Sequence, residues 1–164
     1  MDPKKVSGVT EWKTPKNKRD VQSFLGFANY YRRFIRDFSL IAKPMTRLTG
    51  NVEWQWDEDE QLAFDMIKEA ITTAPVLAIP NHEDLYKVEC DASDFATGAI
   101  LSQKQNDKWH PVAFISKSLT KEEKNYQIYD KEMLSMMLAL REWRHYLKGA
   151  KQQFEIWSDH RNLT

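Results

Sequence analysis

The chain has 164 residues, of which 41% are hydrophobic, 12% aromatic and 29% charged. This length is enough for one domain of ordinary size or two small ones, and the apolar content excludes wholesale disorder. No apolar run approaches the roughly 20 residues of a membrane span, and the opening MDPKKVSG does not resemble a signal peptide. The one cysteine, Cys90, cannot form an internal disulfide, which fits a reducing compartment. We therefore expect a soluble, intracellular protein that is not secreted.

The formal net charge of zero hides an asymmetry along the chain. Residues 1–50 contain 11 basic and four acidic residues, whereas residues 51–164 contain 13 basic and 20 acidic ones. A basic surface attracts a phosphate backbone through charge steering and counterion release. A solvated helix surface would carry the same excess, so charge alone leaves both interpretations open.

The first third of the chain has the residue pattern of short helices. Thr14 followed by Pro15 predicts a helix start with Thr14 as the N-cap, and Gly26 predicts the end of that helix. Ser39 is the expected cap of a further short helix that carries Pro44 near its first turn. In the second predicted helix, aromatic residues recur at the spacing of an apolar helix face: Phe27, Tyr30, Tyr31, Phe34 and Phe38. A small helical module is therefore expected here.

A longer helix is predicted over DEDEQLAFDMIKEAITTAP. Asp57 and Glu60 form a D-x-x-E start that resembles a capping box, and Pro75 is expected to end the helix. Its apolar residues keep a roughly helical spacing: Leu62, Phe64, Ile67 and Ile71. No chemistry is evident in this part of the chain.

The period then changes to that of β-strands. Apolar and polar residues largely alternate in LYKVECDAS, TGAILSQK and HPVAFISKSL, and Gly98 and the polar stretch 105–108 indicate short turns. A long helix is predicted over 121–147, closed by Gly149, and FEIWSDH is predicted to be a fourth strand. The residues that keep the period of the long helix are Tyr126, Tyr129, Met133, Met136, Met137, Leu140 and Trp143. The predicted order is βββαβ in a mixed α+β or α/β fold.

Three acids stand where these elements end or meet. Asp91 ends the first strand, Glu132 lies inside the long helix, and Asp159 ends the fourth strand. If these two strands are parallel neighbours joined by a right-handed crossover through the helix, their acids lie at adjacent strand ends, and a sheet-facing Glu132 approaches both. Clustered carboxylates repel one another in a core but suit Mg²⁺. Two such ions about 4 Å apart activate water in phosphodiester cleavage.

Each acid also has an ordinary structural interpretation. Asp91 fits a turn residue, Glu132 a solvated helix residue, and Asp159 the N-cap of a helix that begins at Arg161. Asp94 competes with Asp91 for the metal role, although its place in the turn after the strand suits hydrogen bonding to the backbone. The pattern alone leaves these alternatives open.

Longer stretches of the sequence resemble the pol polyprotein of gypsy-type LTR retrotransposons and related retroviruses. The thumb region of reverse transcriptase resembles FLGFANYYRRFIRDFS followed by IAKPMTRLTG, and the segment joining polymerase to ribonuclease H resembles WDEDEQLAFDMIKEAITTAPVL. The ribonuclease H domain resembles, in order and spacing, CDASDFATGAILSQ, PVAFISKSLT, NYQIYDKEMLSMMLALREWRHYL and IWSDHRNL. The resemblance runs from about Val9 onward.

This resemblance implies a division of the chain into modules. Residues 1–50 are expected to form a small thumb-like helical module, and residues 51–80 the connecting segment. Residues 81–164 are expected to form a ribonuclease H-like domain with a mixed sheet, truncated before its last strand and helices. In the native element the rest of the pol polyprotein is then a partner of this segment.

The resemblance also implies a chemistry. The family's metal-binding acids fall on Asp91, Glu132 and Asp159, which hold two Mg²⁺ or Mn²⁺ ions that cut the RNA strand of an RNA–DNA hybrid. Selectivity would come from the ribose 2′-OH of the cut strand. The thumb-like module would grip a primer–template duplex, and its candidate phosphate contacts are Lys16, Arg32, Arg33 and Arg36.

Two departures from the family pattern limit this expectation. No Y-x-D-D sequence of a polymerase site occurs, and no acid follows Asp159 to supply the family's fourth ligand, so we expect no polymerisation and weak or lost cleavage. An open edge on the fourth strand predicts a homo-oligomer formed through the sheet edge. A non-catalytic nucleic-acid-binding module and a self-associating structural module are the alternatives. We expect the cytoplasm or a virus-like particle as the location, and no membrane partner.

Overall fold

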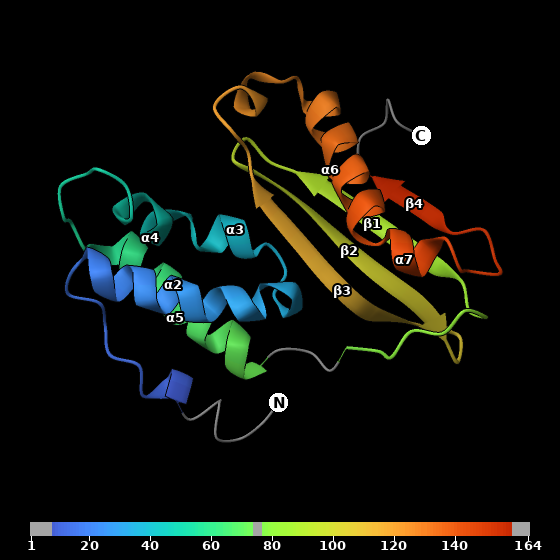
Figure 1. Cartoon of the computed structure of the whole chain (residues 1–164), viewed down its shortest axis with the longest axis horizontal. Coiled ribbons are helices and arrows are strands. Elements are labelled where there is room, and N and C mark those ends of the chain that lie inside the picture. Colours follow the sequence, from blue (N-terminus) through green and yellow to red (C-terminus); the bar gives the residue numbers. More distant parts are fainter. Residues whose placement is uncertain (1–7, 74–76, 159–164) are drawn as a thin grey trace. The chain divides into compact units, whose positions relative to one another are not determined.

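The computed structural model describes residues 8–73 and 77–158. It divides the chain into two compact units, Met1–Ala74 and Pro75–Thr164 (Figure 1). The first unit is helical, and the second combines a four-stranded sheet with helices, so the predicted mixed α and β fold is confirmed. In the described ranges no helix has the length and apolar content needed to cross a membrane.

The helices of the first unit surround one apolar core. They are α2 (Lys18–Tyr31), the 3₁₀ turn η1 (Arg32–Phe34), α3 (Phe38–Ile41), α4 (Lys43–Leu48) and α5 (Glu58–Thr73). The core contains Phe24 of α2, Met45 of α4, and Phe64 and Ile67 of α5, all buried. Helix α5 therefore packs into the same core as the N-terminal helices, and the predicted division at 1–50, 51–80 and 81–164 stays a prediction about family modules.

The predicted start and end of the first helix are wrong. Asn17, not Thr14, is the N-cap, because its side-chain oxygen accepts a hydrogen bond of 3.0 Å from the backbone N–H of Asp20. Gly26 lies inside α2, where a Cβ atom would meet nothing within 4 Å. A glycine inside a helix costs only about 1 kcal/mol, and burial of Phe24 on the same helix outweighs that cost.

The predicted second aromatic helix is divided in the structure. Helix α2 ends at Tyr31, the chain becomes extended at Ile35, and Asp37 adopts a left-handed conformation (φ 55°) before α3 begins. Ser39 consequently lies inside α3 instead of capping a helix, while Pro44 occupies the first turn of α4 as predicted. Of the aromatic residues, Tyr30 is 63% exposed.

Helix α5 begins as its sequence predicts. The Glu60 carboxylate accepts a hydrogen bond of 3.1 Å from the backbone N–H of Asp57, which is the acidic half of a capping box. The same carboxylate is buried and forms an ion pair of 2.9 Å with Arg47 of α4. Leu62 is 60% exposed, and the neighbouring Ala63 is buried in its place.

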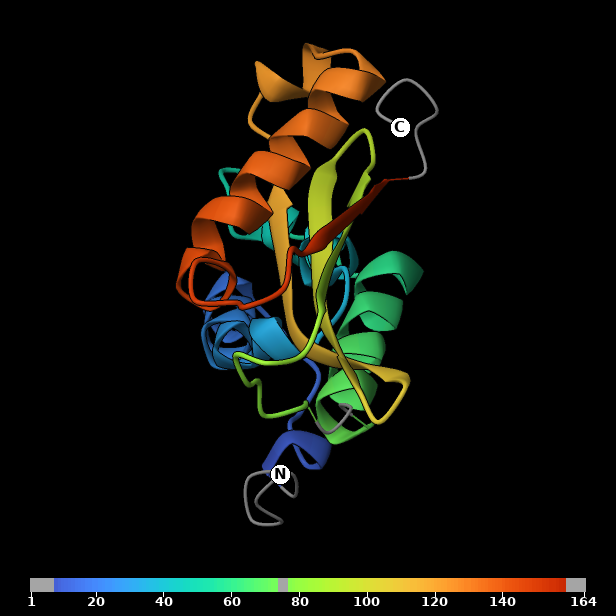
Figure 2. The same ribbon diagram turned by 90° about the vertical axis from the view of Figure 1, so that its right-hand side faces the viewer.

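The second unit is built on a mixed sheet in the order β3-β2-β1-β4 (Figure 2). The strands are β1 (Tyr86–Ala92), β2 (Ala96–Gln105), β3 (Lys108–Ser118) and β4 (Glu155–Ser158). Strands β1, β2 and β3 form an antiparallel meander, and β4 pairs with β1 in parallel, which confirms the predicted order and pairing. Asn106 and Asp107 close the β2–β3 hairpin with φ angles of 51° and 61°, as a tight two-residue turn requires.

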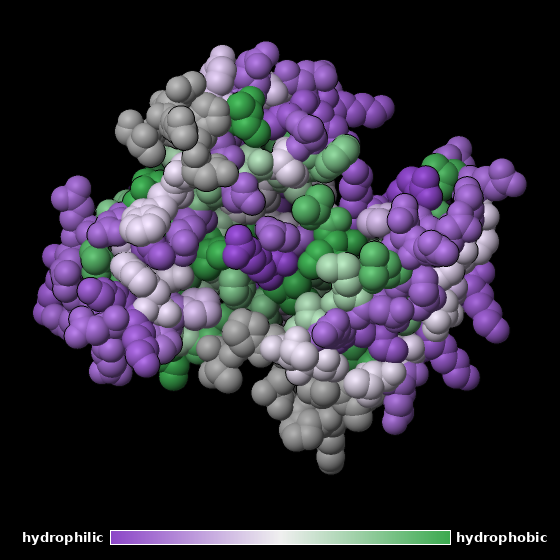
Figure 3. Space-filling model, turned by 180° about the vertical axis from the view of Figure 1, so that it is seen from behind, coloured by the Kyte–Doolittle hydropathy of each residue, from purple (hydrophilic) through white to green (hydrophobic). Residues whose placement is uncertain are grey.

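The predicted long helix is divided into η2 (Glu123–Asn125), α6 (Ile128–Glu142) and α7 (Arg144–Leu147). Helix α6 packs on β1 and β2, and with α7 it contributes Ala139, Trp143 and Leu147 to the apolar core of this unit. Met133 and Met137 keep the helical period but are 47% and 58% exposed. Figure 3 shows that apolar and hydrophilic residues are both present on the face seen from behind.

Candidate functional site

A buried carboxylate on α6 joins the ends of two strands. The Glu132 side chain belongs to a residue that is only 1% exposed, which excludes the solvated helix residue considered above. Its Oε1 atom accepts a hydrogen bond of 2.9 Å from the backbone N–H of Ala92, at the end of β1. Its Oε2 atom accepts one of 3.2 Å from the hydroxyl of Ser158, at the end of β4. Glu132 therefore lies at the carboxyl ends of the parallel strand pair.

Asp91 is far from Glu132 in the sequence, but it directly precedes Ala92, whose backbone N–H binds this carboxylate. It belongs to β1 and not to a turn, is exposed, and is the register partner of Gly98. Because side chains alternate along a strand, Asp91 shares a face with Glu89, whereas Cys90 faces α6. The residue after Asp91 is Ala92, whose N–H binds Glu132, so the structure brings Glu132 to the backbone at Asp91.

The third predicted acid, Asp159, lies outside the described residues. Its neighbour in the sequence, Ser158, is the parallel register partner of Cys90. The residues directly before Asp91 and Asp159 are thus paired across β1 and β4.

Two further polar contacts hold α6 at this end of the sheet. The buried ammonium group of Lys131 forms an ion pair of 2.9 Å with Asp94, whose side chain is 81% exposed. The hydroxyl of Ser135 donates a hydrogen bond of 2.6 Å to the backbone carbonyl of Gly98 in β2. The hydrogen bonding to the turn backbone predicted for Asp94 is made instead by Ser93. The Ser93 hydroxyl oxygen accepts a hydrogen bond from the backbone N–H of Ala96, the first residue of β2.

Cys90 has no reactive thiol in this environment. Burial, together with the nearby Glu132 charge, raises the pKa of the Cys90 thiol to about 12, although a hydrogen bond with Ser135 acts in the opposite direction. The thiol is therefore protonated at neutral pH, and neither a nucleophile nor a thiolate metal ligand is available here.

The donor chemistry of this site suits a hard divalent cation. Mg²⁺ and Mn²⁺ prefer oxygen ligands, and a carboxylate oxygen of the kind that Glu132 supplies is such a ligand. Within 8–73 and 77–158, no group of three or more His, Cys, Asp or Glu side chains is placed to hold a metal ion. The predicted set extends past that range, since Asp159 is its third member.

The predicted phosphate contacts of the first unit do not form one cluster. Lys16 is exposed before α2, whereas the three arginines follow the end of that helix, which is about 21 Å long. Arg32 donates a hydrogen bond of 3.4 Å to Asn29, Arg33 lies 4.9 Å from the centre of the Phe34 ring, and Arg36 pairs with Asp37 at 3.4 Å. All four retain solvent access, Arg32 only in part.

Sequence reasoning missed the polar residues that support Glu132. These residues are Lys131, Ser135 and Ser158, and they do not belong to an apolar period. The only signal in the sequence is their position, one helical turn apart on α6 for the first two and at the end of a strand for Ser158. It also missed a second basic group on α6 and α7, where the signal was a run of unbalanced positive charge over residues 141–148.

Comparison with known proteins identifies the family to which the chain is similar. Residues 56–156 match the family described as the RNase H-like domain found in reverse transcriptase. The Tf2-3 and Tf2-4 transposon polyproteins of the fission yeast Schizosaccharomyces pombe are each 41% identical over 163 residues, covering 96% of this chain. The chain spans 12% of the length of these curated relatives.

Solved structures share the fold at low sequence identity. A foamy viral protease-reverse transcriptase in complex with RNA/DNA hybrid is 22% identical with a TM-score of 0.78, covering 98% of this chain and 22% of that chain. The same viral protein in complex with dsDNA is 22% identical with a TM-score of 0.80, covering 98% and 34%. The predicted resemblance to the pol polyprotein is confirmed: the chain belongs to the family of RNase H-like domains found in reverse transcriptase.

Proposed function

We propose that this chain binds an RNA–DNA hybrid and supplies Asp91, Glu132 and Asp159 to a site that hydrolyses the RNA strand. The observation that carries this proposal is the buried Glu132 carboxylate, held by hydrogen bonds at the ends of β1 and β4. Burial of a carboxylate on a helix costs free energy unless the carboxylate has binding partners or a function. Two partners of Glu132, Ala92 and Ser158, are the sequence neighbours of the two other acids, Asp91 and Asp159. The complex of a structurally similar reverse transcriptase with RNA/DNA hybrid supports the choice of substrate.

The residues would divide the work between positioning and binding. Divalent ions held by the three carboxylates would supply an activated water and stabilise the leaving oxygen. Ala92 and Ser158 fix the Glu132 carboxylate from two directions, so its oxygens do not rotate away from the strand ends. Asp91, being exposed at the end of β1, is open to solvent and to a bound strand.

The first unit would grip the duplex in this proposal. Residues 1–50 would serve as a thumb-like module whose solvent-accessible cations Lys16, Arg32, Arg33 and Arg36 contact phosphates. Because the arginines follow the end of α2 and Lys16 precedes it, they would reach phosphates at two separate places on a duplex.

The proposal is tested by incubating the chain with an RNA–DNA hybrid labelled on the RNA strand, with Mg²⁺ or Mn²⁺. Cleavage by the wild type, expected to be weak, that is lost in Asp91→Asn supports the assignment. The matched control is Asp107→Asn, in the exposed β2–β3 hairpin, which removes the same charge and leaves cleavage unchanged. Hybrid binding without cleavage by the wild type would refute the catalytic part and leave a binding module.

A second candidate function, self-association, rests on the sheet edge. Strand β4 pairs only with β1 in the described sheet, and its Ile156 and Trp157 are exposed. Exposed strand edges with apolar side chains invite pairing with another chain. The expected result is a dimer mass in light scattering that Ile156→Lys converts to the monomer mass, whereas a wild-type monomer at tens of micromolar refutes it.

A further inference from the structure

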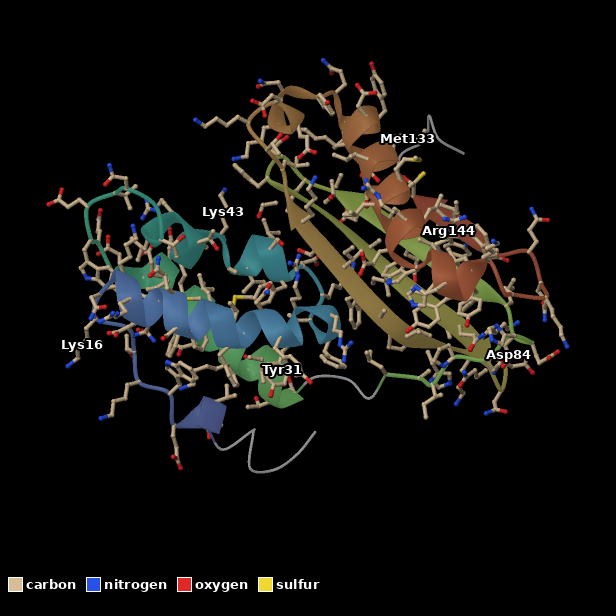
Figure 4. All side chains as sticks on the ribbon, in the orientation of Figure 1. Lys16, Tyr31, Lys43, Asp84, Met133 and Arg144 are labelled. Carbon is tan, nitrogen blue, oxygen red and sulfur yellow. The ribbon has the colours of Figure 1, made fainter. Side chains whose placement is uncertain are left out.

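The second unit carries a basic patch far from the predicted carboxylate site. We define it by Arg141 at the end of α6, Arg144 and His145 of α7, and Lys148, all exposed. Arg144, His145 and Lys148 line a shallow hollow of about 560 Å³ together with Gly149. Figure 4 shows Arg144 on α7 and Met133 well apart from it on α6. Between 141 and 148 only Glu142 is acidic, so the patch is a local excess of positive charge.

The cations of the patch have no acidic partner among the described residues. No ion pair or side-chain hydrogen bond is found for Arg141, Arg144 or Lys148 within residues 8–73 and 77–158. Five other lysines of this unit do pair with carboxylates: Lys87, Lys104, Lys117, Lys131 and Lys151. Unpaired neighbouring cations repel one another, so their concentration on one surface favours an anionic ligand.

The base of the patch is fixed by packing and hydrogen bonds. Trp143 and Leu147 are buried in the core of the unit, on the other side of α7 from the cations. The following loop is tied down as well, because the N–H of Lys151 donates to the carbonyl of His82 at 3.0 Å and the Gln152 side chain donates to that of Glu83 at 2.6 Å. Cations on a fixed base lose less freedom on binding than cations on a mobile loop.

We propose that the basic patch binds the phosphate backbone of the nucleic-acid duplex, as a second contact that positions the hybrid along α6 and α7. The inference rests on the proposed function, because it concerns the same substrate. Followed along the helices, Arg144 is twelve residues from Glu132, about 18 Å at 1.5 Å per residue. Phosphates of one strand repeat about every 3.4 Å, so the patch would meet phosphates about five nucleotides from the cut.

The side chains of the patch suit the phosphate groups of a nucleic-acid backbone. Guanidinium groups bind phosphate oxygens through two hydrogen bonds, and an ammonium group adds a point charge. Arg144 and Lys148 are one helical turn apart and so face the same way. A stabilising interaction of cations with the carbonyl end of α7 is the ordinary explanation for their presence, and it predicts an effect on unfolding instead of binding.

The test measures binding of the full chain to a fluorescent RNA–DNA hybrid over a range of salt concentrations, with EDTA to prevent cleavage. The double variant Arg144→Gln with Lys148→Gln is compared with a control pair, Lys108→Gln with Lys121→Gln, which removes the same charge from exposed positions of the same unit. Losing two phosphate contacts lowers the slope of log K against log salt by about 1.8. The control pair is expected to keep the wild-type slope, and Arg144→Lys to keep most of it.

Each outcome separates the two proposals. A wild-type slope that the double variant leaves unchanged overturns the patch but not hybrid binding. Absence of hybrid binding by the wild type overturns both. If the double variant unfolds at a lower urea concentration than the control pair, wild-type binding and stability of Arg144→Lys still support a charge contact with the hybrid. Equal salt slopes for the single variants Arg144→Lys and Arg144→Gln refute that contact.

Discussion

Replacing Glu132 by alanine should destabilise the second unit more than any exposed acid would. The substitution removes a charged acceptor from the Ala92 N–H and from the Ser158 hydroxyl, at 2.9 and 3.2 Å. A hydrogen bond to a charged group contributes about 1.5–3 kcal/mol, and a buried donor left without a partner adds its desolvation cost. We therefore expect Glu132→Ala to lower the free energy of unfolding by about 3 kcal/mol.

Glutamine should preserve most of that stability. Its carbonyl oxygen can accept from Ala92, and its amide group can donate to the Ser158 hydroxyl, which rotates to accept. Neutral hydrogen bonds contribute about 1 kcal/mol each, and the buried charge disappears with its desolvation cost. The expected loss for Glu132→Gln is about 1 kcal/mol, so the two variants differ by about 2 kcal/mol.

Urea unfolding of the whole chain followed by circular dichroism measures both variants. Glu142→Ala is the matched control, because Glu142 lies on the same helix and is exposed, and its expected effect is within about 0.5 kcal/mol. If Glu132→Ala and Glu142→Ala lower the free energy of unfolding equally, the hydrogen bonds of Glu132 to Ala92 and Ser158 are not formed in solution, and the prediction is wrong.

The same variants distinguish metal binding by Glu132 from its structural hydrogen bonds to the strand ends. Binding of an ion to the folded state alone raises the free energy of unfolding by about 1.4 kcal/mol at ten times its Kd. Wild-type chain in Mg²⁺ or Mn²⁺ should show this rise, and Glu132→Gln, which folds but lacks one carboxylate, should not. An identical rise in both proteins would remove Glu132 from the ligand set while leaving its structural role intact.

Three further predictions concern the second unit. Because the pKa of Cys90 is raised to about 12 from an ordinary value of 9.0, the folded state keeps the thiol proton that the unfolded state loses, so stability falls as pH rises above 9. Between pH 8 and 10 wild type should lose about 1 kcal/mol more than Cys90→Ala in urea unfolding. Asn106→Ala should destabilise by about 1 kcal/mol, since alanine tolerates a φ of 51° poorly, and Asn106→Gly should not. Lys87→Met should cost about 1–2 kcal/mol and change tryptophan fluorescence, because the Lys87 ammonium lies 4.6 Å from the ring centres of both Trp109 and Trp157.

The strand order followed from the sequence because short turns and one crossover helix determine it. Alternation of apolar residues located the three meander strands, and the turn residues Asn106 and Asp107 fixed their hairpin. The parallel pairing of β1 with β4 followed from the helix between them, since such a pair needs a crossover. Boundaries were less predictable, as at Gly26, because the packing of neighbouring residues decides whether a helix continues through a glycine.

The supporting contacts of the candidate site could not be predicted in the same way. The apolar period of α6 includes Met133 and Met137, which are exposed, whereas the buried side at this level carries Lys131, Glu132 and Ser135. Their burial depends on backbone groups at the ends of distant strands, which no local period encodes. Family resemblance named Glu132, but only the three-dimensional contacts give it partners.

The two ends of α6 hold the sheet by different means, and this difference bears on function. Towards its C-terminus Ala139 and Trp143 pack in an apolar core, which stabilises without fixing direction. Towards its N-terminus Lys131, Glu132 and Ser135 each contact a particular strand or turn, and hydrogen bonds and ion pairs are directional. Apolar residues there would also stabilise the helix–sheet contact, so stability does not require the polar set. Positioning of a carboxylate at the strand ends does require it, since a displacement of about 1 Å is enough to impair catalysis. The polar end of α6 is therefore where folding and the proposed chemistry place different demands on the same helix.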